Sequence, residues 1–273
     1  MAPSLWAASF ARASLSAIQI YEDVLVPRLF TPWARLLLNG LGLRPGEAVL
    51  DVACGPGSVT RLAAIEVGSS GRVTGVDLSP AMLTVARAKP VLQGAAEIDF
   101  RLAPAERLLV ANADFDVAVC QQGLQFFSNR AAALAEIRRA VRSGGRIGIA
   151  VWAEIDQSPP FAALEGAVRE VAGNELADRY RSGPWGMPDI NRLRKLLQAS
   201  GFNEVRVAQQ VLPLRFESAV QLGATLLASP IATDLDRLSV QRRKQLSEVL
   251  ERRVVADDAL HAVAVANLAF ARR

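Results

Sequence analysis

Asp51, Gly55 and Gly57 are the residues of this sequence whose types and spacing most clearly suggest chemistry. They stand in the stretch VLDVACGPGSV, where an apolar run ends in Asp51, a glycine-containing loop follows and a helical pattern begins at once. A strand, a glycine turn and a helix in that order bring the backbone close to a charged ligand and point helix N–H groups at it. The stretch therefore predicts a loop that binds a nucleotide-like cofactor.

Several cofactors use such a loop: a nicotinamide dinucleotide, a flavin, a nucleoside triphosphate or S-adenosylmethionine. The triphosphate loop requires Gly-Lys-Ser or Gly-Lys-Thr after the glycines, which is missing here. The dinucleotide fingerprint GxGxxG requires a third glycine where Thr60 stands. Asp77 ends the second apolar run, where an acid accepts hydrogen bonds from ribose hydroxyls. Because dinucleotide and adenosylmethionine sites both use that acid, Asp77 does not decide between them.

The elements that must position these residues alternate regularly between Ala48 and Trp152. Apolar runs typical of buried strands are separated by patterns with helical periodicity. Such alternation predicts a mostly parallel sheet that is covered by helices on both faces. The expected strands are 48–53, 72–77, 98–102, 115–120 and 145–152, and the expected helices are 59–66, 80–89 and 130–142.

The flanking segments are expected to be mainly helical. Residues 4–42 show a helical pattern, with a new helix starting at Thr31-Pro32 and a stop at Gly40 and Gly42. The segment 158–189 is richer in Pro and Gly and is interpreted as looser. The remaining expectations are a helix at 190–200, a strand at 204–212, helices within 217–257 and a final strand at about 260–271, for which helix is a competitor.

Composition excludes several classes of function. The chain has 273 residues, a formal charge of +4 and a hydrophobic fraction of 51%, and it contains no block of Lys and Arg with interleaved aromatic residues. We therefore expect no nucleic-acid partner. No apolar stretch reaches the length of a membrane span. One histidine, His261, and two cysteines offer no metal-ligand spacing, so no metal site is expected, and the compartment is predicted to be reducing and cytoplasmic.

Four stretches together resemble the class I S-adenosylmethionine-dependent methyltransferases. Within that family they are most similar to the small-molecule group related to enzymes of ubiquinone and menaquinone biosynthesis. The resemblance covers roughly residues 45 to 155, with residues 15–45 similar to the helical lead-in of the group. The four stretches, in family order, are VLDVACGPGSVT, VTGVDLSPAMLTVAR, FDVAVCQQGLQFFSN and LAEIRRAVRSGGRIGIAVW.

The resemblance implies a role for each matching position. Asp51 would orient the methionine end of the cofactor, Asp77 would bind the ribose hydroxyls, and the backbone of Cys120 would face the amino group. Leu78 and Met82 would pack on the adenine, although ordinary core packing explains them almost as well. The implied cofactor-binding set is Asp51, Ala53, Gly55, Gly57, Asp77, Leu78, Met82, Ala105, Glu106, Cys120 and Gln122.

One motif departs from the family pattern. An acid after the third strand commonly reads the adenine amino group, but this chain has LAPAERL and places Pro104 there. Proline supplies neither a carboxylate nor a backbone N–H. Ala105 retains its N–H and Glu106 lies one step further, so adenine recognition is expected to be altered.

Few residues are candidates for handling a substrate. Methyl transfer from a sulfonium mainly requires that nucleophile, methyl group and sulfur be held in line while water is excluded. No residue is assigned as catalytic, because the matching region offers no clear base. The substrate-side candidates are Tyr21, Gln125, Trp152 and Trp185, each with core packing as the alternative.

These observations predict an α/β fold with a Rossmann-like, seven-stranded, mostly parallel sheet, one antiparallel strand and a helical lid. The expected segments are a lid at 1–42, a cofactor-binding core at 43–216, a lid insertion at 217–257 and a final core strand at 258–273. The expected function is S-adenosylmethionine-dependent O- or C-methylation of a small, largely apolar metabolite. The alternatives are a non-methylating cyclisation or rearrangement, or binding without catalysis. A homodimer is kept as one candidate assembly.

Overall fold

A seven-stranded sheet forms the centre of the molecule in the computed structural model, which describes residues 15–216, 218–227, 232–256 and 262–273. The strand order is β3-β2-β1-β4-β5-β7-β6, and β7 runs antiparallel to both of its neighbours. The expected fold class, including the antiparallel strand near the C-terminus, is confirmed. The strands are β1 Ala48–Val52, β2 Arg72–Asp77, β3 Glu97–Leu102, β4 Phe115–Gln121, β5 Val141–Trp152, β6 Asn203–Pro213 and β7 Val263–Arg272.

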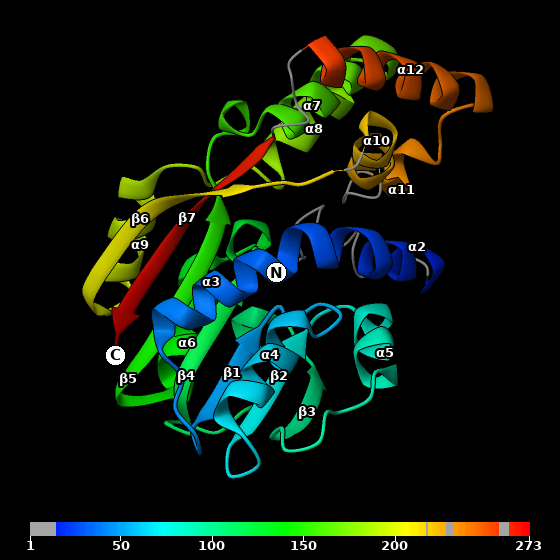
Figure 1. The fold of residues 1–273 in the computed structure, drawn as a ribbon. Helices are drawn as coiled ribbons and strands as arrows, with labels where there is room; N and C mark the ends of the chain where they lie inside the picture. Colours follow the sequence, from blue (N-terminus) through cyan, green and yellow to red (C-terminus); the bar gives the residue numbers. More distant parts are fainter. Residues whose placement is uncertain (1–14, 217, 228–231, 257–261) are drawn as a thin grey trace.

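Helices cover both faces of the sheet (Figure 1). One face carries α3 Thr31–Leu41 and α4 Ser58–Val67, and α5 Pro80–Ala88 packs near the β3 edge. The other face carries α6 Arg130–Ala140 and α9 Ile190–Ala199. Each face has its own buried cluster of apolar side chains, because strands buried on both sides need an apolar layer above and below.

A second group of helices stands beyond the carboxyl ends of the strands (Figure 1). It contains α7 Pro159–Ala172, α8 Asn174–Ser182, α10 Ala219–Leu227, α11 Ala232–Leu235 and α12 Val240–Ala256, and α7 packs against α8, α10 and α12. The expectation of a loose segment at 158–189 is therefore wrong. Pro159 and Pro160 occupy the first turn of α7, where proline is compatible with a helix.

The N-terminal helical region differs in detail from its expected form. It consists of α2 Leu15–Ile20, the π-helix η1 Tyr21–Phe30 and α3, which begins at Thr31 with Pro32 in its first turn, as predicted. Thr31 keeps helical backbone angles, so α3 continues η1 without a break. The N–H of Thr31 donates to the carbonyl of Val26, as π-helical geometry requires. Gly42, with φ of 59°, caps α3, whereas Gly40 lies inside the helix against the ring of Phe270.

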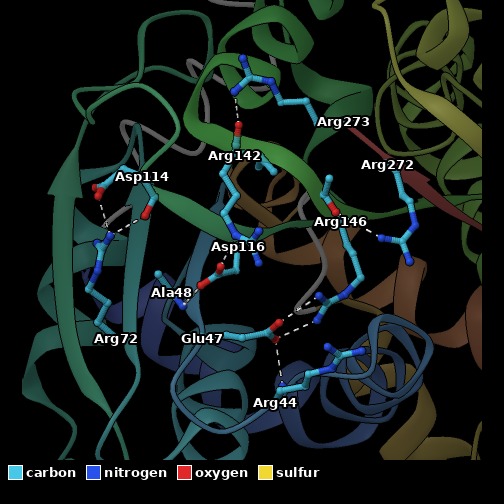
Figure 2. A network of polar contacts seen from close by, with 12 residues as sticks. Arg44, Glu47, Ala48, Arg72, Asp114, Asp116, Arg142, Arg146, Arg272 and Arg273 are labelled. Atoms are coloured by element: carbon cyan, nitrogen blue, oxygen red, sulfur yellow. Dashed lines mark hydrogen bonds and ion pairs between the residues drawn. The ribbon is translucent and has the colours of Figure 1, made fainter.

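Ion pairs hold the amino ends of the strands together (Figure 2). Arg146 donates to both carboxylate oxygens of Glu47 at 2.9 and 2.8 Å, and Arg72 pairs with Asp114 at 2.6 Å. Asp116 accepts from the N–H of Ala48 at 2.7 Å and from Arg142. Burial alone would raise the pKa of Asp116, but these hydrogen bonds hold it below its ordinary value. The carboxyl ends of the parallel strands lie on the opposite side of the sheet from this network.

Candidate functional site

A cavity of about 660 Å³ opens at the carboxyl ends of β1, β2, β4 and β5. This is the position where ligands bind in open α/β sheets. The cavity has a polar end at the strand termini and an apolar end beneath the helices. Of the predicted site residues, it is lined by Tyr21, Asp51, Ala53, Gly55, Asp77, Leu78, Met82, Ala105, Glu106, Gln122, Trp152 and Trp185.

Three predicted residues are not part of the cavity lining. Gly57 caps α4 with φ of 83°, and a Cβ there would lie 3.0 Å from the ring of Phe100. Cys120 is buried within the core, and burial raises the pKa of its thiol to about 12. Gln125 is buried and donates through Nε2 to Oε1 of Gln122 at 2.9 Å. These residues shape the wall from behind. His261 lies outside the described residues.

The glycine loop has backbone angles that suit close approach by a ligand. Ala53, Gly55 and Gln122 have φ of 60°, 55° and 53°, a left-handed conformation that is uncommon for residues other than glycine. A Cβ added at Gly55 would meet no atom within 4 Å, so open space lies above that residue. Non-glycine residues in the left-handed conformation thus follow both β1 and β4, and backbone strain of this kind clusters at functional sites.

Asp77 connects the glycine loop to the end of β2. Its Oδ2 accepts from the N–H of Gly55 and its Oδ1 from the N–H of Ser79, each at 2.8 Å. Burial raises the pKa of Asp77 above its ordinary value, while these hydrogen bonds act in the opposite direction. A carboxylate oxygen can accept more than one hydrogen bond, so both remain able to accept from hydroxyl groups in the cavity.

Asp51 is held by Thr60, the residue that stands where a dinucleotide site would have its third glycine. Thr60 Oγ1 donates to Asp51 Oδ2 at 2.6 Å. Burial raises the pKa of Asp51 from 3.8 to about 7, and the hydrogen bond from Thr60 limits that increase. The ionised carboxylate is therefore costly at this buried position, and a cationic group beside it would compensate that cost.

We expect ligand affinity to depend on the charge of Asp51. Between pH 4 and 7 Asp51 retains a proton in the folded state that it has lost in the unfolded state, so its contribution to the free energy of unfolding falls as the pH rises. A ligand with an ammonium group binds the ionised carboxylate, so its affinity should rise with pH. We expect it to bind about tenfold more tightly at pH 7.5 than at pH 6. Calorimetry with S-adenosylhomocysteine at both pH values measures this effect.

Two variants control that measurement. Asp51→Asn should flatten the pH profile and reveal the part that comes from the ligand's own amino group. Thr60→Val should move the rise in affinity to higher pH, because it removes the hydrogen bond that favours the ionised carboxylate. A pH profile of Asp51→Asn identical to the wild-type profile would contradict the role of Asp51.

The loop after β3 closes another side of the cavity. Ala103, Pro104, Ala105, Glu106 and Arg107 all line it. Pro104 precedes the short 3-10 helix η2 Ala105–Arg107. The Glu106 carboxylate accepts through Oε1 from the N–H of Asn129 at 3.2 Å, which fixes its position beside the cavity. Among the residues of this loop that line the cavity, Glu106 is the one that carries a carboxylate.

Aromatic rings form the apolar end. Trp152 ends β5 and lies 5.5 Å from Trp185 and 6.2 Å from Phe161, measured between ring centroids. Tyr21 and Phe30 of η1 are 5.1 Å apart, and Phe30 lies 6.3 Å from Trp152, so η1 contributes to the same group of rings. Sequence patterns had indicated Tyr21 and both tryptophans, but not Phe30, Phe161 or Tyr180, which also line the cavity. Phe161 had a weak signal, because it begins an apolar series with helical spacing.

Comparison with known proteins agrees with this geometry. Residues 49–145 match the family model described as Methyltransferase domain. The ubiquinone/menaquinone biosynthesis C-methyltransferase UbiE of Ectopseudomonas mendocina is 30% identical over 196 residues, which cover 68% of this chain and 77% of that enzyme. The chain belongs to the class I S-adenosylmethionine-dependent methyltransferases.

One further relative and one solved structure are also similar to this methyltransferase. Nocamycin O-methyltransferase of Saccharothrix syringae is 29% identical and covers 83% of the chain and 84% of its own length. The solved structure of Haemonchus contortus phosphoethanolamine N-methyltransferase 2 with S-adenosyl-L-methionine superposes with a TM-score of 0.64 at 18% identity, which shows a shared fold. The superposition covers 98% of this chain and 60% of that one.

The residues around the cavity fit S-adenosylmethionine, the family's cofactor. The sulfonium and ammonium groups are cationic, and the polar end presents Asp51 and Asp77. Ser58 Oγ and Gln122 Nε2 are buried without a partner among the described residues, and both residues line the cavity. The described residues include no cluster of three or more His, Cys, Asp or Glu side chains that could hold a metal ion. Within the same part of the chain, no helix is long and apolar enough to cross a membrane.

Proposed function

We propose that this methyltransferase transfers a methyl group to oxygen or carbon of a small, largely apolar metabolite. The observation that carries the proposal is the cavity itself, which combines a carboxylate-bearing end with an aromatic end in one continuous space. The curated relatives act, according to their names, in C-methylation and O-methylation. When bound, S-adenosylmethionine supplies an electrophilic methyl group on sulfur.

The chain's own residues bind and orient the two ligands in this proposal. Asp77 accepts from the ribose hydroxyls, and Asp51 faces the ammonium group. Leu78 and Met82 pack against the adenine, and Ala105 and Glu106 face its edge. Gln122, oriented by Gln125, donates from Nε2 at the end of β4. Trp152, Trp185 and Tyr21 enclose the substrate and exclude water, which favours displacement between aligned groups.

The titratable side chains of the cavity offer little base catalysis. Those that line it are Tyr21, Asp51, Cys54, Asp77, Glu106, Arg107 and Tyr180. Burial, with Glu22 and Asp77 nearby, raises the pKa of Tyr21 far above its ordinary value, so its hydroxyl stays protonated. The carboxylates serve the cofactor end. We therefore propose that the reacting O–H or C–H group of the substrate is itself acidic. The protein then activates it by positioning it.

The segment boundaries follow from the same proposal. Of the lid predicted at 1–42, residues 1–14 lie outside the described residues, and α3 packs on the sheet and belongs with the core. We propose that η1 and the helices α10, α11 and α12 of the predicted insertion 217–257 form the lid, with 43–216 and the final strand β7 as the rest of the core. We add α7 and α8 to this lid, because α7 packs on α12 and α10. We also propose a cytoplasmic location, with a homodimer as one assembly to test by sedimentation.

A labelling experiment tests the proposed function. The protein is incubated with S-adenosylmethionine carrying an isotopic methyl group and with extracted metabolites. We expect label in an apolar, extractable product, and much less label with the Asp77→Ala variant. Consumption of a metabolite without label transfer would instead support a cyclisation or rearrangement. Absence of S-adenosylhomocysteine binding in calorimetry would refute both enzymatic readings.

A further inference from the structure

The π-helix η1 lines the cavity, and polar contacts with β4 and with the end of α5 hold its two ends. It contributes Tyr21, Leu25, Val26, Leu29 and Phe30 to the lining. At its C-terminal end, Nε2 of Gln121, at the end of β4, donates to the carbonyl of Phe30 at 3.0 Å. η1 therefore forms one wall of the cavity from Tyr21 to Phe30.

Lys89 holds the other end of η1. Its Nζ lies 2.5 Å from Oε1 of Glu22 and donates to the carbonyl of Pro56 at 2.9 Å. Glu22 follows Tyr21 at the start of η1, and Pro56 lies between the two glycines of the cofactor loop. One ammonium group thus joins the covering helix to the loop beneath it. We call these three groups the Lys89 bridge.

A side chain of α4 fixes the backbone at the end of α5, where Lys89 stands. Arg61, on the helix that follows the glycine loop, donates from Nη2 to the carbonyls of Ala86 and Lys89 at 2.5 and 2.9 Å. It also donates from Nη1 to the carbonyl of Pro90 at 2.7 Å. The end of α5 is therefore anchored on α4, and Lys89 has a fixed base from which to reach Glu22.

The Glu22 carboxylate is largely buried where it meets Lys89. Its side chain is 16% exposed, and its Oε2 is buried without a partner among the described residues. Removing one partner of a partly buried pair leaves the other charge desolvated, which costs far more than breaking an exposed pair. Loss of Lys89 should therefore drive Glu22 toward water and pull the start of η1 with it.

We propose that Lys89 is a positioning residue that couples closure of η1 to the cofactor loop and so controls the rate at which the cofactor product leaves. The proposal rests on the proposed function, because it places S-adenosylhomocysteine behind η1. Neither Lys89 nor Glu22 lines the cavity, so they act through Tyr21 and Pro56, which do. Their effect should be kinetic, on release, more than on the contacts of the bound molecule.

The test compares dissociation rates of S-adenosylhomocysteine, measured by chase with excess unlabelled compound. Lys89→Met and Glu22→Gln should each raise the dissociation rate constant by about 10-fold or more. The double variant should be no faster than the faster single variant, because both remove the same bridge. Asp23→Asn is the matched control: it removes the same charge one residue along, where Asp23 is exposed and contacts Gln19 of its own helical segment.

A second measurement does not require the cofactor. Hydrogen exchange of the amides of residues 21–30 should be faster in Lys89→Met and Glu22→Gln than in wild type, with β4 as the internal reference. Unchanged exchange, or variants that bind S-adenosylhomocysteine and release it at the wild-type rate, would overturn the proposal. Failure of the wild type to bind S-adenosylhomocysteine would contradict the proposed function instead, and the exchange measurement would still decide whether the bridge holds η1.

Discussion

Replacing Asp77 by alanine should weaken S-adenosylhomocysteine binding by about 100-fold or more. The estimate combines two lost hydrogen bonds to a charged acceptor, each contributing about 1.5 to 3 kcal/mol. The same change frees the N–H groups of Gly55 and Ser79, which Asp77 holds at 2.8 Å, so the glycine loop also loses its tie to β2. Calorimetry on the purified variant measures the combined effect.

A ligand analogue separates the two contributions. The 2′-deoxy form of S-adenosylhomocysteine should bind the wild type more weakly than the parent compound does, whereas the Asp77→Ala variant should bind both equally. Asp99→Asn is a suitable control, because it removes an exposed carboxylate on the neighbouring strand β3. Equal discrimination between the two ligands by wild type and variant would contradict a ribose role for Asp77 and leave only loop anchoring.

Replacing Trp33 by alanine should lower the free energy of unfolding by about 3 to 5 kcal/mol. Trp33 is fully buried in α3 and packs edge-on against Trp152, with ring centroids 5.9 Å apart. Its removal leaves a void behind the aromatic wall of the cavity. For a chain of this size the melting temperature should fall by about 10 °C. Thermal unfolding followed by circular dichroism measures the change.

Trp33→Phe is the matched comparison. Trp33 Nε1 is buried without a partner among the described residues, so phenylalanine removes a polar atom that makes no hydrogen bond. We therefore expect the phenylalanine variant to lose much less stability than the alanine variant. Equal losses in both variants would contradict this expectation and show that the part of the indole that phenylalanine lacks stabilises this position.

The sheet and its cofactor loop could be predicted because their signals are local. The apolar run before Asp51, the glycines after it and the acid at Asp77 are features of consecutive residues whose spacing follows from strand and turn geometry. Helix α7 was missed because its two prolines and glycine suggested a loop. Its apolar residues Phe161, Leu164, Val168 and Val171 nevertheless recur at helical spacing and are buried.

Contacts between distant segments left no comparable signal. Thr60 was considered only as an absent glycine, and its hydrogen bond to Asp51 requires the turn to place them together. Lys89 lies at the end of a helix, where nothing in the sequence indicates contact with Glu22. Gly57, Cys120 and Gln125 were predicted at the site but do not line the cavity. A match to a family motif places a residue near the site, but it does not determine which side chains reach the surface of the cavity.

The π-helical geometry of η1 makes the length of this segment as important as its composition. Each residue of an α-helix turns the chain by about 100°, because 3.6 residues complete a turn. Deleting one residue between Val24 and Phe30 would favour α-helical winding and rotate everything before the deletion by about that angle. Tyr21 and Glu22 would then turn away together from the cavity and from Lys89. The number of residues in η1 thus sets the direction in which Tyr21 and Glu22 point. An insertion or deletion can change that direction even when every side chain that touches the ligand is retained.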